Sequence, residues 1–132
     1  MERKNYLIDT NVAIYYFGLL LSKDSELFLE SLFKDKYFIS VINRIELLGF
    51  DKLNPDQYKA LELFVNNATV IDLDESIVLE TINIRRAHKT KTPDAIIAAT
   101  CIVKNCTLIT NNRKDFESIE GLFLKTLAMA KP

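Results

Sequence analysis

One stretch of this chain constrains its fold more than any other, because it is apolar on every side of the helix that it predicts. Residues 95–103 read AIIAATCIV and contain no charged position. A helix of this kind lies inside a domain and not on its surface. The preceding residues predict where it begins, since Thr92 can cap it, Pro93 suits its first turn and Asp94 favours the same end. We therefore expect a buried helix that starts at this point.

Short strand-like runs alternate with helical patterns along the rest of the chain. The expected strands are mostly apolar and cover residues 6–8, 37–41, 69–71, 107–110 and 122–124, the last at an edge. The expected helices have apolar positions at helical spacing and lie around residues 12–17, 27–32, 42–48, 55–65, 75–86 and 93–103. This alternation predicts a single α/β domain over residues 1–132, with a mostly parallel sheet covered on both faces.

The composition excludes several kinds of site. Cys101 and Cys106 match no zinc-ligand spacing and His88 is the only histidine, so we expect both cysteines to be small buried residues in a reducing compartment. The three glycines form no phosphate-binding loop. No apolar run is long enough to cross a membrane, and no signal peptide precedes the first strand. These features predict a cytoplasmic protein, whose net charge of −1 does not by itself mark a nucleic-acid binder.

Polar residues gather where the parallel strands of the predicted sheet end. Asp9 directly follows the first strand, and Thr110, Asn111 and Asn112 lie at the end of the fourth. Asp94 begins the buried helix that packs against the sheet. Glu46 lies about one turn into the helix after the second strand, among apolar neighbours, and we expect it to point inward. Ligands of open parallel sheets bind beyond the carboxyl ends of the strands, which makes this edge the candidate site.

Each of these residues also has an ordinary structural explanation. Asp9 can cap the first helix, Asp94 can interact with a helix dipole, and asparagines suit turns. Together, however, three converging carboxylates repel one another and should have raised pKa values unless a cation lies between them. Carboxylate and amide oxygens suit Mg²⁺ or Mn²⁺ and not zinc. Such a cation near a phosphodiester can activate water, so the edge predicts hydrolysis of that bond.

Four motifs, which follow one another along nearly the whole chain, match a known family. They are residues 7–11 (LIDTN), residues 39–41 leading into residues 45–49 (IELLG), residues 91–99 (KTPDAIIAA) and residues 108–116 (LITNNRKDF). In these motifs the chain resembles the PIN domain, and specifically the VapC-like toxins. The resemblance implies a PIN-like three-layer α/β/α sandwich and a magnesium-dependent endoribonuclease. It also implies a homodimer and a cognate antitoxin protein that blocks the acidic pocket.

The resemblance further implies roles for individual residues. The family's acidic positions correspond here to Asp9, Glu46 and Asp94. The family's fourth acidic position is often Asp, whereas this chain has Asn112, which contributes no charge, with Asp115 nearby as the remaining metal ligand. Thr110 would orient a water or a ligand in the site. Mg²⁺, or Mn²⁺ in its place, would be the cofactor, and RNA the substrate.

Basic residues beside the last two motifs could contact the phosphates of RNA. The basic residues that could do so are Arg85, Arg86, His88, Lys89, Lys91, Arg113 and Lys114, and we expect Arg85, Arg86, Lys91 and Arg113 to bind phosphate. The alternative is that they form a solvated helix end that interacts favourably with the helix dipole.

Six apolar residues crowd into a short stretch near the N-terminus. They are Tyr15, Tyr16, Phe17, Leu19, Leu20 and Leu21. They are too many for one buried face, so we expect a partly exposed patch that contacts a partner, with core packing as the alternative.

Two other functions fit parts of the pattern. A receiver-like phosphoacceptor domain shares the architecture and could use Asp72 or Asp74 after the third strand, but Asp9 lacks the second acid that such a domain has. A PIN-like fold without catalysis, serving as an RNA- or protein-binding module, is the other alternative. Asn112 favours it, and the three retained carboxylates speak against it.

Overall fold

The computed structural model describes residues 4–132, in which strands and helices alternate as the sequence predicts. The strands, in chain order, are β1 (Asn5–Ile8), β2 (Phe38–Ser40), β3 (Thr69–Ile71), β4 (Cys106–Ile109) and β5 (Leu124–Lys125). The helices are α1 (Thr10–Phe17), α2 (Lys23–Phe33), α3 (Val41–Leu48), α4 (Pro55–Asn67), α5 (Glu75–Ala87), α6 (Thr92–Lys104) and the short 3₁₀ helix η1 (Arg113–Asp115).

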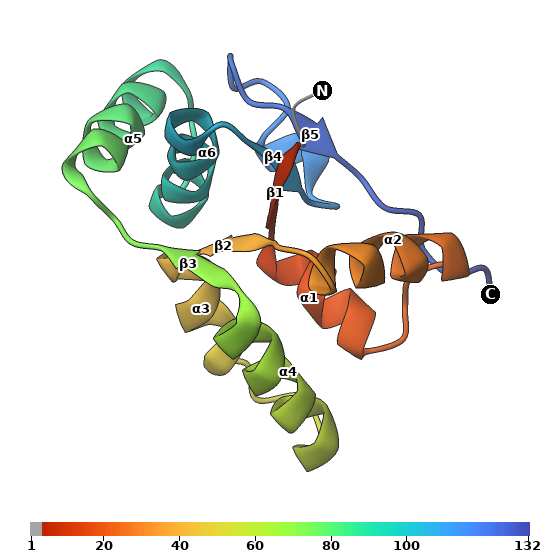
Figure 1. The fold of residues 1–132 in the computed structure, drawn as a ribbon. Coiled ribbons are helices and arrows are strands. Elements are labelled where there is room, and N and C mark those ends of the chain that lie inside the picture. Colours follow the sequence, from red (N-terminus) through yellow and green to blue (C-terminus); the bar gives the residue numbers. More distant parts are fainter. Residues whose placement is uncertain (1–3) are drawn as a thin grey trace.

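The strands form one parallel sheet in the order β3-β2-β1-β4-β5 (Figure 1). The chain moves from β1 outward to β2 and β3, and then crosses to the opposite side of β1 to add β4. In open α/β sheets, ligands bind beyond the carboxyl ends of the two strands at which the order reverses. Here those strands are β1 and β4, which are paired from Asn5 opposite Cys106 to Ile8 opposite Ile109.

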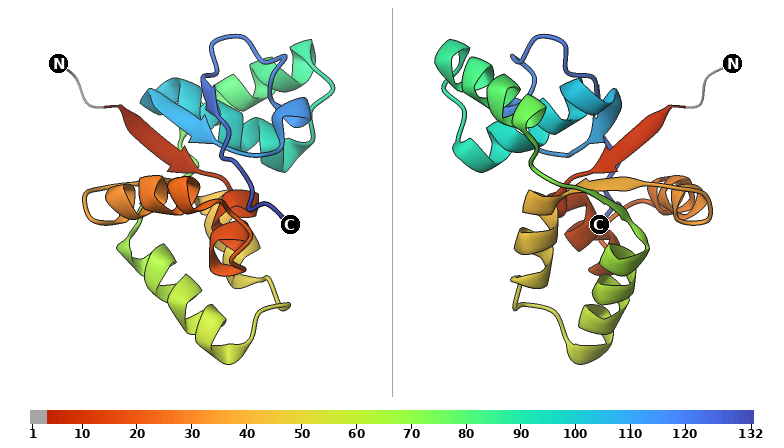
Figure 2. Two further views of the ribbon diagram at one scale, coloured as in Figure 1. Left: turned by 90° about the vertical axis from the view of Figure 1, so that its right-hand side faces the viewer. Right: turned by 60° about the vertical axis from the view of Figure 1, so that its left-hand side comes forward.

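The sheet separates two cores, because successive residues of a strand point to opposite faces. Leu7 and Leu108 contribute to the core under α5 and α6, whereas Ile8 and Ile109 contribute to the core that α1, α2, α3 and α4 cover. Figure 2 shows these two groups of helices on either side of the strands. The predicted three-layer α/β/α sandwich with a parallel sheet is therefore confirmed.

Helix α6 is the buried helix that the sequence predicts, since all seven residues from Ala95 to Cys101 are buried. The prediction for its first residue is wrong. Thr92 is already helical, and Lys91 occupies the capping position without a side-chain hydrogen bond. The physical reason is that the Thr92 hydroxyl is engaged elsewhere, where it accepts a hydrogen bond from the Arg85 guanidinium.

Two of the predictions about apolar residues are tested by burial. Cys101 and Cys106 are free and buried, as expected. The stretch of residues 15–21 is divided: Leu19 and Leu20 are 75% and 50% exposed, whereas Leu21 is buried. The exposed patch is thus confirmed only for the turn between α1 and α2. Within residues 4–132, no helix has the length and apolar character needed to cross a bilayer.

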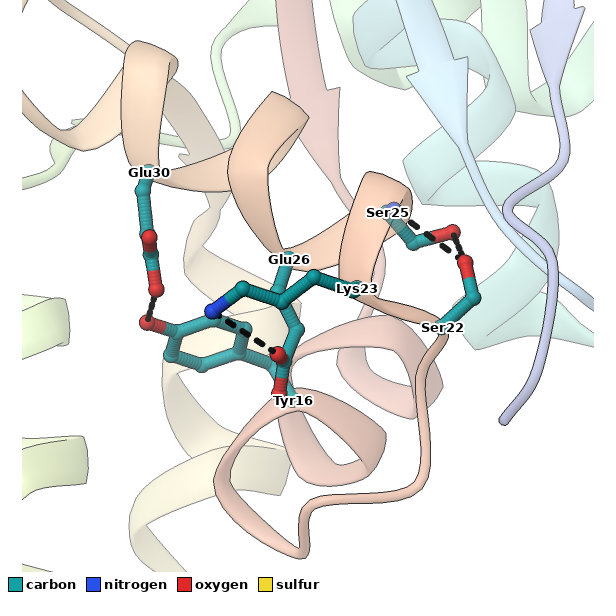
Figure 3. Close-up of polar contacts among 6 residues, drawn as sticks. All are labelled: Tyr16, Ser22, Lys23, Ser25, Glu26 and Glu30. Atoms are coloured by element: carbon teal, nitrogen blue, oxygen red, sulfur yellow. Dashed lines mark hydrogen bonds and ion pairs between the residues drawn. The ribbon is translucent and has the colours of Figure 1, made fainter. Parts of the chain in front are cut away.

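Polar contacts join the two helices on either side of that turn (Figure 3). The Tyr16 hydroxyl on α1 donates to Glu30 Oε2 on α2 at 2.7 Å. Burial, reinforced by the Glu30 carboxylate, raises the pKa of Tyr16 to about 12, so the hydroxyl keeps its proton at neutral pH. At the start of α2, the backbone N–H of Ser25 donates to the Ser22 hydroxyl, which caps the helix.

Candidate active site

Asp9 lies at the carboxyl end of β1, caps α1 and is only 5% exposed. Its Oδ1 accepts hydrogen bonds from Thr10 N at 2.9 Å and Asn43 Nδ2 at 3.2 Å. Its Oδ2 accepts from Thr110 Oγ1 at 2.8 Å and Asn11 Nδ2 at 3.3 Å. Burial raises the pKa of the Asp9 carboxyl, although several of these hydrogen bonds act in the opposite direction. The result is a buried carboxylate held firmly in one orientation.

Thr110 follows β4 and is fully buried, as its place beside Asp9 requires. Its hydroxyl donates to Asp9 and accepts a hydrogen bond from the backbone N–H of Asn112 at 3.1 Å. The reversal of strand order brings these residues together from positions about a hundred apart in the chain. The predicted proximity of Asp9 and Thr110 is therefore found in the structure.

Glu46 reaches the site from α3, but it does not point inward as predicted. Its side chain is exposed, and its Oε1 accepts a hydrogen bond from Thr10 Oγ1 at 2.6 Å. The carboxylate still lies close enough to raise the pKa values of Asp9 and Asp94 by charge repulsion. A carboxylate that remains hydrated avoids the large cost of burying a charge, which explains its outward position.

Asp94 lies in the first turn of α6 and is partly buried. Burial, and then the nearby charges of Asp115, Asp9 and Glu46, raise the pKa of Asp94 to about 6. A hydrogen bond that Asp94 shares with the Asp115 carboxyl acts in the same direction. The repulsion that the sequence predicts for converging carboxylates is thus present at Asp94, and it places all four acidic groups around one region.

Asn112 and Asp115 form a pair within the turn that follows β4. Asn112 Nδ2 donates to Asp115 Oδ2 at 2.6 Å. Asn112 is exposed, so the Asp115 carboxylate that its amide binds lies at the edge of the site. Asp115 supplies the fourth negative charge in place of the acid that is absent at position 112.

Three polar residues of this site received no role from the sequence, although two of them, Thr10 and Asn11, lie within the first motif. The side-chain amides of Asn11 and Asn43 both donate hydrogen bonds to the Asp9 carboxylate. Thr10 donates to Asp9 through its backbone N–H and to Glu46 through its hydroxyl. Asn43 is fully buried and also caps its own helix by accepting from Ser40 N at 2.8 Å. Its position one turn before Glu46 in α3 is the signal that could have identified it, because residues three apart share a helix face.

The predicted phosphate-binding residues do not all lie beside the acidic groups. Arg85 is bonded to Thr92, and Arg113 is bonded to Thr126 Oγ1 at 3.2 Å and lies 3.9 Å from Glu117 Oε2. Arg86 is exposed in the last turn of α5. A polar pocket at Asp94 and Asp115 is instead lined by Lys91 together with Lys89, Thr90, Lys114 and Ser118.

The chemistry of these side chains fits a hard divalent cation. Carboxylate and hydroxyl oxygens are the ligands that Mg²⁺ and Mn²⁺ prefer. Burial, and then the charges of the neighbouring carboxylates, raise the pKa of Asp94, and a bound cation would offset both effects. Among residues 4–132, no three acidic, histidine or cysteine side chains are close enough together to enclose a metal ion. The carboxylates therefore share one region without forming a complete set of ligands.

The chain is similar to proteins of a known family. The family model of the PIN domain matches residues 6–122, which is most of the chain. The curated protein Ribonuclease VapC1 from Methanocaldococcus jannaschii is 31% identical over 130 residues, covering 94% of this chain and 88% of that protein.

Solved structures show the same fold. The complex VapBC2 from Rickettsia felis, bound to a DNA fragment from its promoter, contains a chain that superposes with a TM-score of 0.77 at 26% identity, covering 92% of this chain and 97% of that one. A toxin-antitoxin complex from Klebsiella pneumoniae gives a TM-score of 0.73 at 28% identity, covering 89% and 95%.

Proposed function

Since this chain belongs to the PIN-domain family and, within it, to the VapC group, we propose that it is a metal-dependent endoribonuclease that acts as the toxin of a toxin–antitoxin pair. One observation carries the proposal. Acidic groups from four separate elements converge where β1 and β4 end, and burial together with their charges raises the pKa of Asp94 to about 6. Such a surplus of charge is unfavourable unless it serves to bind a cation.

Asp9, Glu46, Asp94 and Asp115 would hold Mg²⁺ or Mn²⁺. When bound beside a phosphodiester, such an ion lowers the pKa of water and stabilises the leaving oxygen. The chain's own residues supply orientation. Thr110 holds Asp9 through its hydroxyl, and Asn112 holds Asp115 through its amide. Histidine is not needed for this chemistry, and His88 lies at the end of α5, outside these contacts.

Lys89, Lys91 and Lys114 would contact RNA phosphates, because they line the pocket that Asp94 and Asp115 also line. All three are exposed. Their charges oppose those of the carboxylates and would allow a polyanion to approach an acidic centre. Arg85, Arg86 and Arg113 remain predicted contacts further from this pocket.

The lysines can be tested without catalysis. In a protein inactivated by Asp94→Asn, exchanging both Lys91 and Lys114 for Ala should weaken binding of single-stranded RNA and lower the slope of log affinity against log salt by about 0.7 per lost contact. The matched control exchanges Lys34 and Lys59, which are exposed on α2's end and on α4, for Ala. Equal effects of the two pairs in a fluorescence-anisotropy titration would exclude a specific phosphate contact.

The partner of this chain would be an antitoxin protein, because the similar structures include complexes of the VapBC type. Leu19 and Leu20, exposed between α1 and α2, supply apolar surface for such a contact. A homodimer and a cytoplasmic location belong to the same proposal.

The proposal is tested by incubating the protein with a mixed RNA pool and Mg²⁺, Mn²⁺ or EDTA. We expect cleavage with either metal and none with EDTA. A folded protein that binds RNA in the anisotropy titration, but leaves it intact with both metals, would instead support the binding-module alternative.

A further inference from the structure

The C-terminal residues 126–130 run back across the molecule and contact the turn between α1 and α2. Leu21 and Met129 form an antiparallel bridge, and Ala130 N donates to Leu20 O at 2.8 Å. The carbonyl of Ala128 accepts from Ser22 N at 3.0 Å and from Ser25 Oγ at 2.8 Å. We call residues 126–130 the C-terminal strap. It is not part of the matched family region, which ends at residue 122.

Figures 1 and 3 show how this strap is placed. In Figure 1 the C-terminus lies beside α1 and α2, far along the chain from both. Figure 3 shows Ser22 and Ser25 hydrogen-bonded to each other at the start of α2. The strap therefore ends on a capped and well-ordered helix start, which makes it a fixed attachment.

Asn111 joins the strap to the acidic site. Its side chain binds the backbone of Leu127 on both sides: Asn111 Oδ1 accepts from Leu127 N at 2.9 Å, and Asn111 Nδ2 donates to Leu127 O at 3.0 Å. Leu127 is itself buried in the core under α1 and α2. The Asn111 amide is therefore held by a segment that is anchored at both ends.

The hydrogen bonds continue from Asn111 to the proposed metal ligand. The backbone N–H of Asn111 donates to Asn11 Oδ1 at 3.2 Å. The other end of that amide, Asn11 Nδ2, donates to Asp9 Oδ2 and to Thr110 Oγ1, both at 3.3 Å. A connected series of hydrogen bonds thus leads from the strap through Asn111 and Asn11 to Asp9.

We propose that Asn111 and Asn11 are positioning residues, through which the C-terminal strap fixes the orientation of the Asp9 carboxylate. The inference rests on the proposed function, because it assigns these residues a role at the proposed metal site. Partners that orient a metal ligand typically change metal affinity or activity by about 10–100-fold when they are removed. A purely structural role would change the stability of the fold and nothing else.

The test compares Asn111→Ala and Asn11→Ala with Tyr37→Phe. The control removes one buried hydrogen bond, from Tyr37 Oη to Phe64 O at 2.5 Å, and Tyr37 directly precedes the first residue of β2, away from the carboxyl end of that strand. Two quantities are measured for each protein: the affinity for Mn²⁺ alone, and kcat and KM on an RNA that the wild type cleaves. Circular dichroism and melting temperature report the fold.

We expect each asparagine variant to bind Mn²⁺ about 10-fold more weakly and to lose kcat with little change in KM. The double variant should lose no more Mn²⁺ affinity and kcat than the more impaired of the two single variants, because the two residues act in one series of hydrogen bonds. Tyr37→Phe should change only the melting temperature.

Unchanged Mn²⁺ affinity and kcat in folded Asn111→Ala and Asn11→Ala proteins would overturn the inference, whatever the melting temperatures. If the wild type cleaves no RNA, the proposed function fails, and the Mn²⁺ affinities still decide the role of the strap. If Asn111→Ala does not fold, Asn11→Ala gives the same two readouts, since Asn11 lies nearer to Asp9.

Discussion

Replacing Asp94 by Asn should abolish RNA cleavage and at the same time stabilise the metal-free protein at neutral pH. Activity should fall about 10³-fold, because a carboxylate that neutralises a catalytic cation contributes several kcal/mol to the transition state. The gain in stability follows from the pKa of Asp94, which burial and three neighbouring carboxylates raise to about 6. Asparagine has almost the same shape and removes the repelled charge.

The pH dependence of this effect has a definite sign. An unfolded Asp loses its proton near pH 4, whereas folded Asp94 keeps its proton until about pH 6. In EDTA, the contribution of protonated Asp94 to the free energy of unfolding is therefore complete below pH 4 and is lost as the pH rises through 6. Since Asp94 is only partly buried, solvent screening reduces the effect to about 1 kcal/mol.

Thermal melts of the wild type and of Asp94→Asn between pH 4 and 7.5 measure the difference directly. The wild-type melting temperature should fall relative to that of the variant across this range, and added Mg²⁺ should restore it only in the wild type. If the melting temperatures of the two proteins change equally with pH in EDTA and respond equally to Mg²⁺, Asp94 neither has a raised pKa in the folded protein nor contributes to metal binding.

Replacing Phe116 by Ala should lower the free energy of unfolding by about 3–5 kcal/mol. Phe116 directly follows Asp115 and is 1% exposed, in the core under α5 and α6. Its backbone N–H also closes the turn by donating to Arg113 O at 3.0 Å. The cavity would lie beneath the turn that carries Asn112 and Asp115, so RNA cleavage should fall as well.

The chain contains a matched control for this substitution. Phe123 is 71% exposed, and Phe123→Ala should change the free energy of unfolding by no more than about 0.5 kcal/mol. Urea denaturation measures both variants, and an unchanged slope with denaturant shows that the comparison is one of stability. A loss below about 1 kcal/mol for Phe116→Ala would contradict the core position described here.

The sequence was sufficient to predict the elements that repeat a simple pattern. The apolar run in α6 predicts a buried helix, and strands alternating with helices predict a parallel sheet. The cap of α1 could be identified because a single side chain, that of Asp9, determines it. The residues that follow β1 and β4 could be assigned to one site because strand ends in a parallel sheet share an edge.

The remaining features depend on contacts between residues far apart in the chain. The exposed side chain of Glu46 accepts a hydrogen bond from Thr10, which belongs to another helix. The capping role expected of Thr92 is lost because Arg85 engages its hydroxyl. Asn43 has no local signal beyond its spacing to Glu46, and its contact with Asp9 arises only once α3 packs beside α1. Side-chain partners of this kind follow from tertiary packing and cannot be read from periodicity.

The position of β4 between β1 and β5 has a consequence during synthesis of the chain. Asp9 leaves the ribosome about a hundred residues before Thr110 and Asp115, and residues 126–130 follow later still. Parallel pairing over such a separation forms late, because the intervening chain must be ordered first. A nascent chain that has not yet reached Asp115 holds only part of the acidic cluster, so the four carboxylates can come together only after that residue has emerged.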